Sequence, residues 1–389
     1  MGSTIPSTYI MEKIGLKRYK CQLYIVFTLL LLIISLYFVL FQKANMKPNL
    51  EPSGSGLKLI LFWNTFYGNE EYYWGLGHEA FKKNCPTGLA QNCETSSDKK
   101  LLKKADAIVM FTRQFSKPHV KYQNQQWVFF NVEPPPHSFD SSDNMPNVPQ
   151  RLSELKNVFD LTMTYRLDSD AIRTYGQMVP FNSSAPHNFH NYAEGKEKLI
   201  AWFVSHCDTS SNRMAYVDDL KQHVDVDIYG DCGDLKCPRF SDECNDMVNK
   251  KYKFVLALEN AICRDYISEK VFNSLKLDAV PIVMGGGNYS NVVPTHSVIN
   301  IADYLSPKAL ADYLKILDKN DTLYNGYFTW KGKFEFRDRP GFCDLCMKLN
   351  HLSQSKTPYK NMYNWYVRDA KCRRWNSQAQ EWSIDEGLT

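Results

Sequence analysis

Short apolar runs recur along the chain from residue 57 and alternate with polar or helix-forming stretches. The first series reads LKLILFWN from Leu57, DAIVMFT from Asp106, QWVFFNVE from Gln126 and LTMTYRL from Leu161. Continuous runs of this length, rich in β-branched and aromatic residues, predict parallel strands that are buried on both faces. We therefore expect a first α/β domain over residues 57–190.

A second series of the same kind follows the polar stretch 181–196, which is typical of a linker. It reads KLIAWFVS from Lys198, VDIYG from Val226, YKFVLALEN from Tyr252 and AVPIVMG from Ala279. Helices are expected near residues 213–223, 268–277 and 307–317. Strands that alternate with helices predict a second doubly wound α/β domain over residues 191–389. Ligands of such folds bind at the carboxyl ends of the strands, so we expect the active site between the two domains.

Residues 21–41 contain no charge and are predominantly apolar, and about 20 such residues suffice for a helix to cross a bilayer. A cleaved signal peptide is the alternative, but the run is too long and no small-x-small cleavage site follows it. Four basic residues precede the run closely and only two follow it, which keeps the N-terminus in the cytosol. The sequence predicts a cytoplasmic tail (1–20), a signal-anchor (21–41), a stem (42–56) and a lumenal remainder, as in a single-pass type II membrane protein.

The charge of the chain is balanced, with 46 basic and 42 acidic residues and a net charge of +4. Proteins that bind nucleic acid through phosphate contacts carry a larger basic excess, so we expect no nucleic-acid partner.

Ten of the eleven cysteines lie beyond the predicted anchor, where an oxidising lumen favours disulfides. A zinc site is the alternative for Cys232, Cys237 and Cys244 and for the pair Cys343 and Cys346, but the finger spacing is lacking. Three Asn-X-Ser/Thr sequons are candidates for lumenal N-glycosylation. They begin at Asn182, Asn288 and Asn320.

A dense set of polar residues follows the apolar run from Tyr252, within YKFVLALENAICRDYISEKVFNSLKLDAVPIVMGGG. The set comprises Glu259, Asn260, Arg264, Asp265, Tyr266, Glu269 and Lys270. Ser268 is a candidate N-cap, which would place Glu269 and Lys270 on the first turn of a helix. Free N–H groups and the positive end of the helix dipole favour an anionic ligand there.

This block resembles the donor-binding motif of the α1,3-fucosyltransferases, glycosyltransferase family 10. Leu258, Ala261 and Ser268 stand where the family usually has Phe, Ser and Thr. Further stretches that resemble the family are NVEPPPHSF at Asn131, TMTYRLDSD at Thr162, SHCDTSSNR at Ser205, YGDCGDLKCPR at Tyr229 and the Cys343-x-x-Cys346 pair. In the second of these, Leu167 replaces the second of two usual arginines.

The resemblance implies a GT-B fold, in which two Rossmann-like domains face a central cleft, with the acceptor-binding domain first and the GDP-fucose-binding domain second. It further implies a Golgi enzyme that moves L-fucose from GDP-fucose to O3 of a GlcNAc in glycoprotein glycans, with inversion. No tightly bound cofactor is implied. The C-terminal tail would return to the first domain, and a homo-oligomer is compatible with the sequence.

By matching positions, Glu133 is implied as the general base that removes the acceptor proton. Without the resemblance, a Glu that caps the turn before Pro134 is an equally good interpretation. Arg213 and Lys270 are implied to stabilise the charge on the departing pyrophosphate. Tyr266 and Glu269 are implied to hold the ribose or the fucose, with Asn260 nearby.

No Asp-x-Asp pair stands out as a metal clamp, because Asp225 and Asp227 lie in an expected strand whose face can simply be solvated. We expect no obligatory metal, although a divalent cation could stimulate turnover. The family pattern implies that Cys85 and Cys93 pair with Cys343 and Cys346. Cys207 and Cys263, at the ends of two strands, form a further candidate pair, and Cys232, Cys237 and Cys244 leave one partner open.

Two acceptors stay open. The YGDCGDLKCPR stretch resembles invertebrate members that modify the innermost GlcNAc of N-glycans, which we favour slightly. Arg113 lies roughly where Lewis-type enzymes carry an acceptor-choosing residue, which suggests an antennal Galβ1-4GlcNAc instead. A catalytically silent Golgi glycan-binding protein is the alternative to an enzyme, but Glu133, Arg213, Glu269 and Lys270 are all present. A fucosidase would need two carboxylates that flank the bond and no nucleotide site.

Overall fold

The computed structural model describes residues 56–138, 155–181, 190–238, 241–351 and 359–385. The predicted tail, the anchor at 21–41, nearly all of the stem and Asn182 lie outside the described residues. Within these described ranges, no helix is long and apolar enough to cross a membrane.

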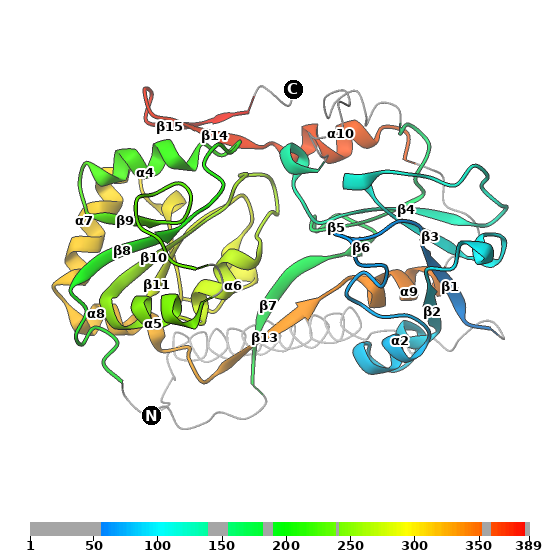
Figure 1. Ribbon diagram of the computed structural model, residues 1–389, viewed down its shortest axis with the longest axis horizontal. Coiled ribbons are helices and arrows are strands. Elements are labelled where there is room, and N and C mark those ends of the chain that lie inside the picture. The colour runs from blue at the N-terminus through cyan, green and yellow to red at the C-terminus, as the bar shows by residue number, and fades with distance from the viewer. Residues whose placement is uncertain (1–55, 139–154, 182–189, 239–240, 352–358, 386–389) are drawn as a thin grey trace, which may run out of the picture. The chain divides into compact units, whose positions relative to one another are not determined.

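The first domain is built on a parallel sheet with the order β2-β1-β3-β4-β5-β6 (Figure 1). Its strands are β1 (Lys58–Phe62), β2 (Cys93–Ser96), β3 (Ala107–Phe111), β4 (Gln126–Asn131), β5 (Leu161–Thr164) and β6 (Ala171–Ile172). Every residue of β3 and β4 is buried, which explains their unbroken apolar sequence. Helices α2 (Glu79–Asn84) and α9 (Phe342–His351) contribute to the core on one face, and α10 (Met362–Tyr366) to the core on the other.

The second domain repeats this plan with the order β12-β11-β10-β8-β9. Its strands are β8 (Lys198–Phe203), β9 (Val226–Tyr229), β10 (Tyr252–Leu258), β11 (Val280–Met284) and β12 (Ile299–Asn300). Its helices are α4 (Arg213–Lys221), α5 (Asp242–Lys251), α6 (Glu269–Leu275), α7 (Pro307–Asp318) and α8 (Asp321–Asn325). Residues of α4, α7 and α8 pack on one face of the sheet, and residues of α5 and α6 on the other.

Both sheets have the same connectivity. Counted from its own first strand, the first sheet runs 2-1-3-4-5-6 and the second runs 2-1-3-4-5, so both contain one of the two common doubly wound orders. In each sheet the second strand lies on one side of the first strand and the third strand lies on the other. The topological switch points therefore lie between β1 and β3 and between β8 and β10. The prediction of an α/β fold with parallel sheets is therefore confirmed, and so are the three expected helices, which are α4, α6 and α7.

Several 3-10 helices complete the described chain. They are η1 (Leu89–Gln91), η2 (Lys99–Lys104), η3 (Thr112–Gln114), η4 (Pro135–His137), η6 (Tyr289–Asn291), η7 (Ile301–Asp303), η8 (Gly326–Phe328) and η9 (Arg368–Ala370).

An antiparallel ribbon carries the chain between the domains. It pairs β7 (Thr174–Pro180) with β13 (Phe334–Arg339) (Figure 1). A Cβ on Gly176 would overlap the ring of Phe336, and the φ of Gly176 is +131°, so only glycine fits there.

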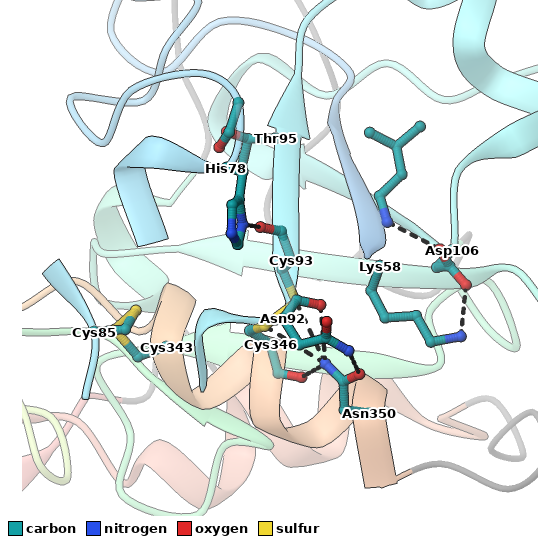
Figure 2. The surroundings of a disulfide bond; sticks show 12 residues. Lys58, His78, Cys85, Asn92, Cys93, Thr95, Asp106, Cys343, Cys346 and Asn350 are labelled. Carbon is teal, nitrogen blue, oxygen red and sulfur yellow. Dashed lines mark hydrogen bonds and ion pairs between the residues drawn. A yellow bond between two sulfur atoms is a disulfide. The ribbon is translucent and has the colours of Figure 1, made fainter. Parts of the chain in front are cut away.

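Helix α9, which follows β13, returns to the first sheet and is held there by two disulfides (Figure 2). Cys85 bonds to Cys343 and Cys93 to Cys346, the pairs that the resemblance implied. The amide of Asn350 adds hydrogen bonds to the carbonyls of Asn92 and Cys346 (Figure 2).

The expected Cys207–Cys263 disulfide is wrong. Cys263 bonds to Cys372, and Cys207 to Cys232. The backbone explains the difference, since Arg264 N donates to Ala370 O and Arg373 N to Ile262 O, which brings the late segment 370–373 alongside the loop after β10.

The remaining cysteines pair as Cys237–Cys244, so all ten cysteines beyond the predicted anchor form disulfides. The zinc alternative for them is thereby excluded. After Cys372 the chain forms a hairpin of β14 (Arg373–Asn376) and β15 (Glu381–Ile384). Its Trp382 stacks on Tyr216 of α4, and its Trp375 contacts the same ring edge-on.

Candidate active site

The polar loop of the second domain is organised by Glu259, the residue that follows β10. Its carboxylate is fully buried and accepts hydrogen bonds of 2.7 Å from both N and Oγ of Ser268. Lys270 Nζ lies 3.0 Å from Oε2 of Glu259, the oxygen that also accepts from Ser268 Oγ. A buried carboxylate is stable only when it is paired in this way, so Glu259 fixes the start of α6. Sequence reasoning placed Glu259 in the polar loop but gave it no role.

Lys270 belongs to this network and lies on the first turn of α6. Its Nζ is also 3.5 Å from Oε1 of Glu269. Burial lowers the pKa of Lys270, but the charges of Glu259 and Glu269 outweigh burial and raise it overall, so the ammonium keeps its charge. Arg213 opposes this rise, which shows that the two cations lie within electrostatic reach of each other.

Arg213 begins α4, after β8. Its guanidinium donates to the carbonyls of Leu258 (2.6 Å) and His206 (2.9 Å) and lies 5.7 Å from the ring of Trp202. Burial lowers the pKa of Arg213, and its buried Nε has no hydrogen-bond partner in the described part of the protein. Two neighbouring cations at the switch point between β8 and β10 suit an anionic ligand such as a diphosphate.

Asn260 and Tyr266 lie in the same loop but differ in what surrounds them. The side-chain Oδ1 of Asn260 is buried and has no hydrogen-bond partner among the described residues. Tyr266 is 1% exposed, and its ring packs 5.1 Å from Tyr165 and 6.1 Å from Tyr175 of the first domain. Tyr266 therefore joins the two domains by packing. Glu269 is the most open of the expected donor residues, with a side chain 53% exposed.

Glu133 follows β4 at the carboxyl edge of the first sheet. Its backbone is fixed, because Glu133 N donates to Asn131 Oδ1 (2.9 Å) and its carbonyl accepts from the hydroxyls of Ser138 (3.3 Å) and Tyr366. Pro134 and Pro135 then lead into η4. The side chain is held separately, by a 2.7 Å hydrogen bond from the hydroxyl of Tyr67 to Oε1.

The electrostatic surroundings of Glu133 come from both domains. Burial raises the pKa of Glu133, while the Tyr67 hydrogen bond and the charges of Arg113 and Lys270 lower it. Glu269 contributes in the raising direction. The carboxylate thus lies within electrostatic reach of the cation that the second domain presents, and a raised pKa suits a general base.

Arg113 and His137 lie on the same edge of the first sheet, after β3 and β4. Arg113 lies in η3, with its guanidinium 5.7 Å from the ring of Tyr67. His137 lies in η4, and its Nε2 is 3.4 Å from the carbonyl of Asn260 across the domain boundary. Burial lowers the pKa of His137 to about 4, so this imidazole is neutral at physiological pH.

The structure therefore brings Glu133 and Arg113 together at the carboxyl edge of the first sheet. The carboxyl edge of the second sheet carries the remaining candidates, which are Arg213, Asn260, Glu269 and Lys270. Sequence reasoning missed Tyr67. It lies 66 residues from Glu133, and nothing in the local sequence signals a contact over that separation.

Two further sets of expected residues lie elsewhere. Asn288 and Asn320 are exposed, and their side chains accept N-cap hydrogen bonds from Ser290 N and Leu323 N, so their glycosylation stays a prediction. Asp227 pairs with Lys198 of β8 at 2.5 Å. In the described ranges no group of three potential ligands could hold a metal ion.

Comparison with known proteins gives the family. The description "Glycosyltransferase family 10 (fucosyltransferase) C-term" matches residues 193–365, and "Fucosyltransferase, N-terminal" matches residues 55–176. An α-(1,3)-fucosyltransferase C of Drosophila melanogaster is 33% identical, over 81% of this chain and 79% of that protein. A glycoprotein 3-α-L-fucosyltransferase A of the same organism is 33% identical, over 84% of this chain and 64% of that protein.

A human 3-galactosyl-N-acetylglucosaminide 4-α-L-fucosyltransferase is also 33% identical, over 71% of this chain and 75% of that protein. A solved α1,3-fucosyltransferase with GDP superposes with a TM-score of 0.49 at 16% identity, over 79% of this chain and 94% of that chain.

Two doubly wound domains that set a carboxylate on one carboxyl edge against a pair of cations on the other define the class of nucleotide-sugar transferases. Within that class, the chain belongs to glycosyltransferase family 10, the fucosyltransferases.

Proposed function

We propose that this enzyme transfers L-fucose from GDP-β-L-fucose to O3 of a GlcNAc residue in glycoprotein glycans, with inversion at the anomeric carbon. The observation that carries the proposal is the position of Glu133, whose carboxylate is held by Tyr67 at 2.7 Å on the carboxyl edge of the first sheet, while Lys270 lies on the first turn of α6 in the second domain. A base for the acceptor and a cation for the leaving group are thereby provided from opposite domains.

In this reaction the acceptor hydroxyl attacks the fucosyl anomeric carbon while its proton passes to Glu133. The bond from that carbon to the GDP oxygen breaks, and its electron pair leaves on the diphosphate. Lys270 and Arg213 stabilise the charge that develops there more strongly in the transition state than in the ground state. Burial contributes by keeping Glu133 more basic than a solvated carboxylate.

For the acceptor, we propose the innermost GlcNAc of N-glycans. The YGDCGDLKCPR stretch supports this choice by its resemblance to core-modifying members, and Cys207–Cys232 and Cys237–Cys244 hold it. Lewis-type transfer to antennal Galβ1-4GlcNAc is the second candidate, because Arg113 lies beside the Tyr67–Glu133 pair. No metal takes part in this scheme, although a divalent cation could stimulate turnover.

The test is transfer from labelled GDP-fucose by secreted residues 57–389 to a panel that contains a core N-glycan and Galβ1-4GlcNAc. Glu133→Gln is expected to reduce transfer by at least about 10²-fold, because it removes a general base and keeps the shape of the side chain. The better acceptor decides between the two candidates. A folded fragment that binds GDP but transfers to neither glycan would contradict the proposal and favour a silent glycan-binding member.

We further propose a type II orientation in the Golgi membrane, which the uncharged run at 21–41 supports. In the full chain, sugar removable by an endoglycosidase at Asn288 or Asn320 is expected. A catalytic region digested by protease in intact microsomes would contradict this orientation.

A further inference from the structure

Tyr67 is the residue through which the loop after β1 contacts the carboxylate of Glu133. The contact spans the carboxyl edge of the first sheet, since β3 lies between β1 and β4. The hydroxyl donates to Oε1 over 2.7 Å, a distance typical of a strong hydrogen bond to a charged acceptor.

The backbone at Tyr67 adopts a conformation that is unfavourable for tyrosine. Phe66 and Asn69 exchange two backbone hydrogen bonds of 3.0 Å, and Tyr67 and Gly68 between them have φ values of +49° and +80°. Positive φ at both central residues is typical of a type I′ turn, which favours Asn-Gly. A tyrosine in this place is strained, and strain of this kind clusters at functional sites.

Tyr67 is 44% exposed, but aromatic neighbours and a cation orient its ring. It lies 4.9 Å from the ring of Phe66 and 5.1 Å from that of Phe111, and the guanidinium of Arg113 lies 5.7 Å from it. Burial and the negative charge of Glu133 raise the pKa of Tyr67, so the phenol keeps its proton and acts as the donor.

We propose that Tyr67 is a positioning residue for fucosyl transfer: its hydroxyl fixes one carboxylate oxygen of Glu133 and leaves the other to accept the acceptor proton. The inference rests on the proposed role of Glu133 as the base. It extends that role, because the pairing also favours the ionised carboxylate, which is the form that can take up a proton.

Several charged and titratable groups face Glu133. Tyr67 and Arg113 do so from the first domain, and Lys270 and Glu269 from α6. Four buried tyrosines also interact with its charge, namely Tyr165, Tyr175, Tyr266 and Tyr366. Among the interactions that lower the pKa of Glu133, the Tyr67 hydrogen bond is the largest. Its removal raises that pKa, so the base becomes protonated at a higher pH.

The test is the pH profile of kcat/KM for Tyr67→Phe, from about pH 5 to about pH 9. The acidic limb is expected to move to higher pH by about one pH unit, with kcat/KM roughly tenfold lower on that limb and the loss shrinking at higher pH. The KM for GDP-fucose should stay unchanged, because Tyr67 lies on the acceptor domain.

Tyr73→Phe is the matched control. Tyr73 is 69% exposed, its ring lies 5.9 Å from that of Phe66, and its φ is also positive, at +54°. The hydroxyl that donates to the Glu133 carboxylate is that of Tyr67 and not that of Tyr73. A wild-type pH profile is expected for this variant.

A Tyr67→Phe profile whose acidic limb coincides with that of the wild type overturns the inference. Glu133→Gln tests the proposed base independently of Tyr67. Substantial turnover by Glu133→Gln would refute Glu133 as the base, whatever the profile of Tyr67→Phe. Thermal unfolding gives a readout without turnover. The pH range over which Glu133 lowers stability should extend further upward in Tyr67→Phe, and an unchanged range overturns the pairing.

Discussion

The two carboxyl edges share one strand order but are held in different ways. On the second domain, a buried carboxylate fixes Lys270, and the disulfides Cys207–Cys232 and Cys263–Cys372 lock the loops on either side. On the first domain, the described contacts that fix Glu133 are hydrogen bonds. The two disulfides there fasten α9 to β2 and to the end of α2 instead.

The difference fits the proposed division of work, in which the second edge binds the nucleotide sugar and the first edge binds the acceptor. A nucleotide sugar has one shape, so a rigid, pre-organised site binds it with little ordering on binding. Acceptor glycans vary, and an edge held by hydrogen bonds can change its surface without loss of the fold. Substitutions on the second edge should therefore affect stability as well as activity, and those on the first edge should affect activity alone.

The largest expected effect is loss of the Cys263–Cys372 disulfide, whose cysteines are 109 residues apart. Serine at both positions should destabilise the protein by about 4–5 kcal/mol if the loss is mainly loop entropy. The matched control, Cys237→Ser with Cys244→Ser, opens a loop with a separation of only seven and should cost about 2–3 kcal/mol. Urea unfolding measures the stability of both double variants. Equal losses of stability would contradict the larger contribution expected from the Cys263–Cys372 disulfide.

The next largest effect is expected for Glu259→Gln, which should lower the free energy of unfolding by about 3 kcal/mol. It removes the charge that balances Lys270 and leaves a buried network half satisfied. The same chemical change at Glu133 should not destabilise the protein at neutral pH. Denaturant unfolding of the two variants side by side tests the contrast between the edges, and similar losses would remove it.

Lys270→Met keeps an unbranched side chain one atom shorter than lysine and removes its charge. We expect kcat to fall by about 10²-fold, because a cation near the leaving diphosphate is lost. Calorimetric titration with GDP should show weaker binding as well. Normal GDP affinity together with normal kcat would exclude Lys270 from the donor site.

The smallest effect is on pH dependence. Because the folded pKa of Glu133 is raised above its ordinary value of 4.5, the folded protein binds the extra proton more tightly than the unfolded chain. Stability contributed by this group is therefore present at low pH and falls as pH rises from 4.5 through the raised pKa. Glu133→Gln should melt higher than the wild type at neutral pH, and the gap should close toward pH 4.5.

Most strands could be predicted from sequence because their environment is uniform. All seven residues of β10 are buried, so its apolar run is unbroken. Helix α5 was not among the expected helices, since DECNDMVNKK buries only Cys244 and Val248. The candidate donor residues Asn260, Tyr266, Glu269 and Lys270 stand out together in the sequence because they lie within one loop and one helix start, whereas Arg213 of α4 came only from the resemblance.

Long-range contacts were out of reach of the same reasoning. Cys263 was expected to pair with the nearer Cys207, but backbone pairing with residues 370–373 selects Cys372. Tyr67 was missed for the same reason, because it follows β1 whereas its partner Glu133 follows β4. Local pattern predicts elements and loops, whereas the pairing of distant side chains depends on the assembled fold.

The Cys263–Cys372 link also constrains the order of biosynthesis. The loop after β10 can reach its locked form only once residue 372 has left the ribosome and met an oxidising compartment. By then both sheets, which end at β12, have already been synthesised. We therefore expect a chain interrupted anywhere before residue 372 to form much of its two cores yet bind GDP poorly, which makes nucleotide retention a measure of how completely the enzyme has matured.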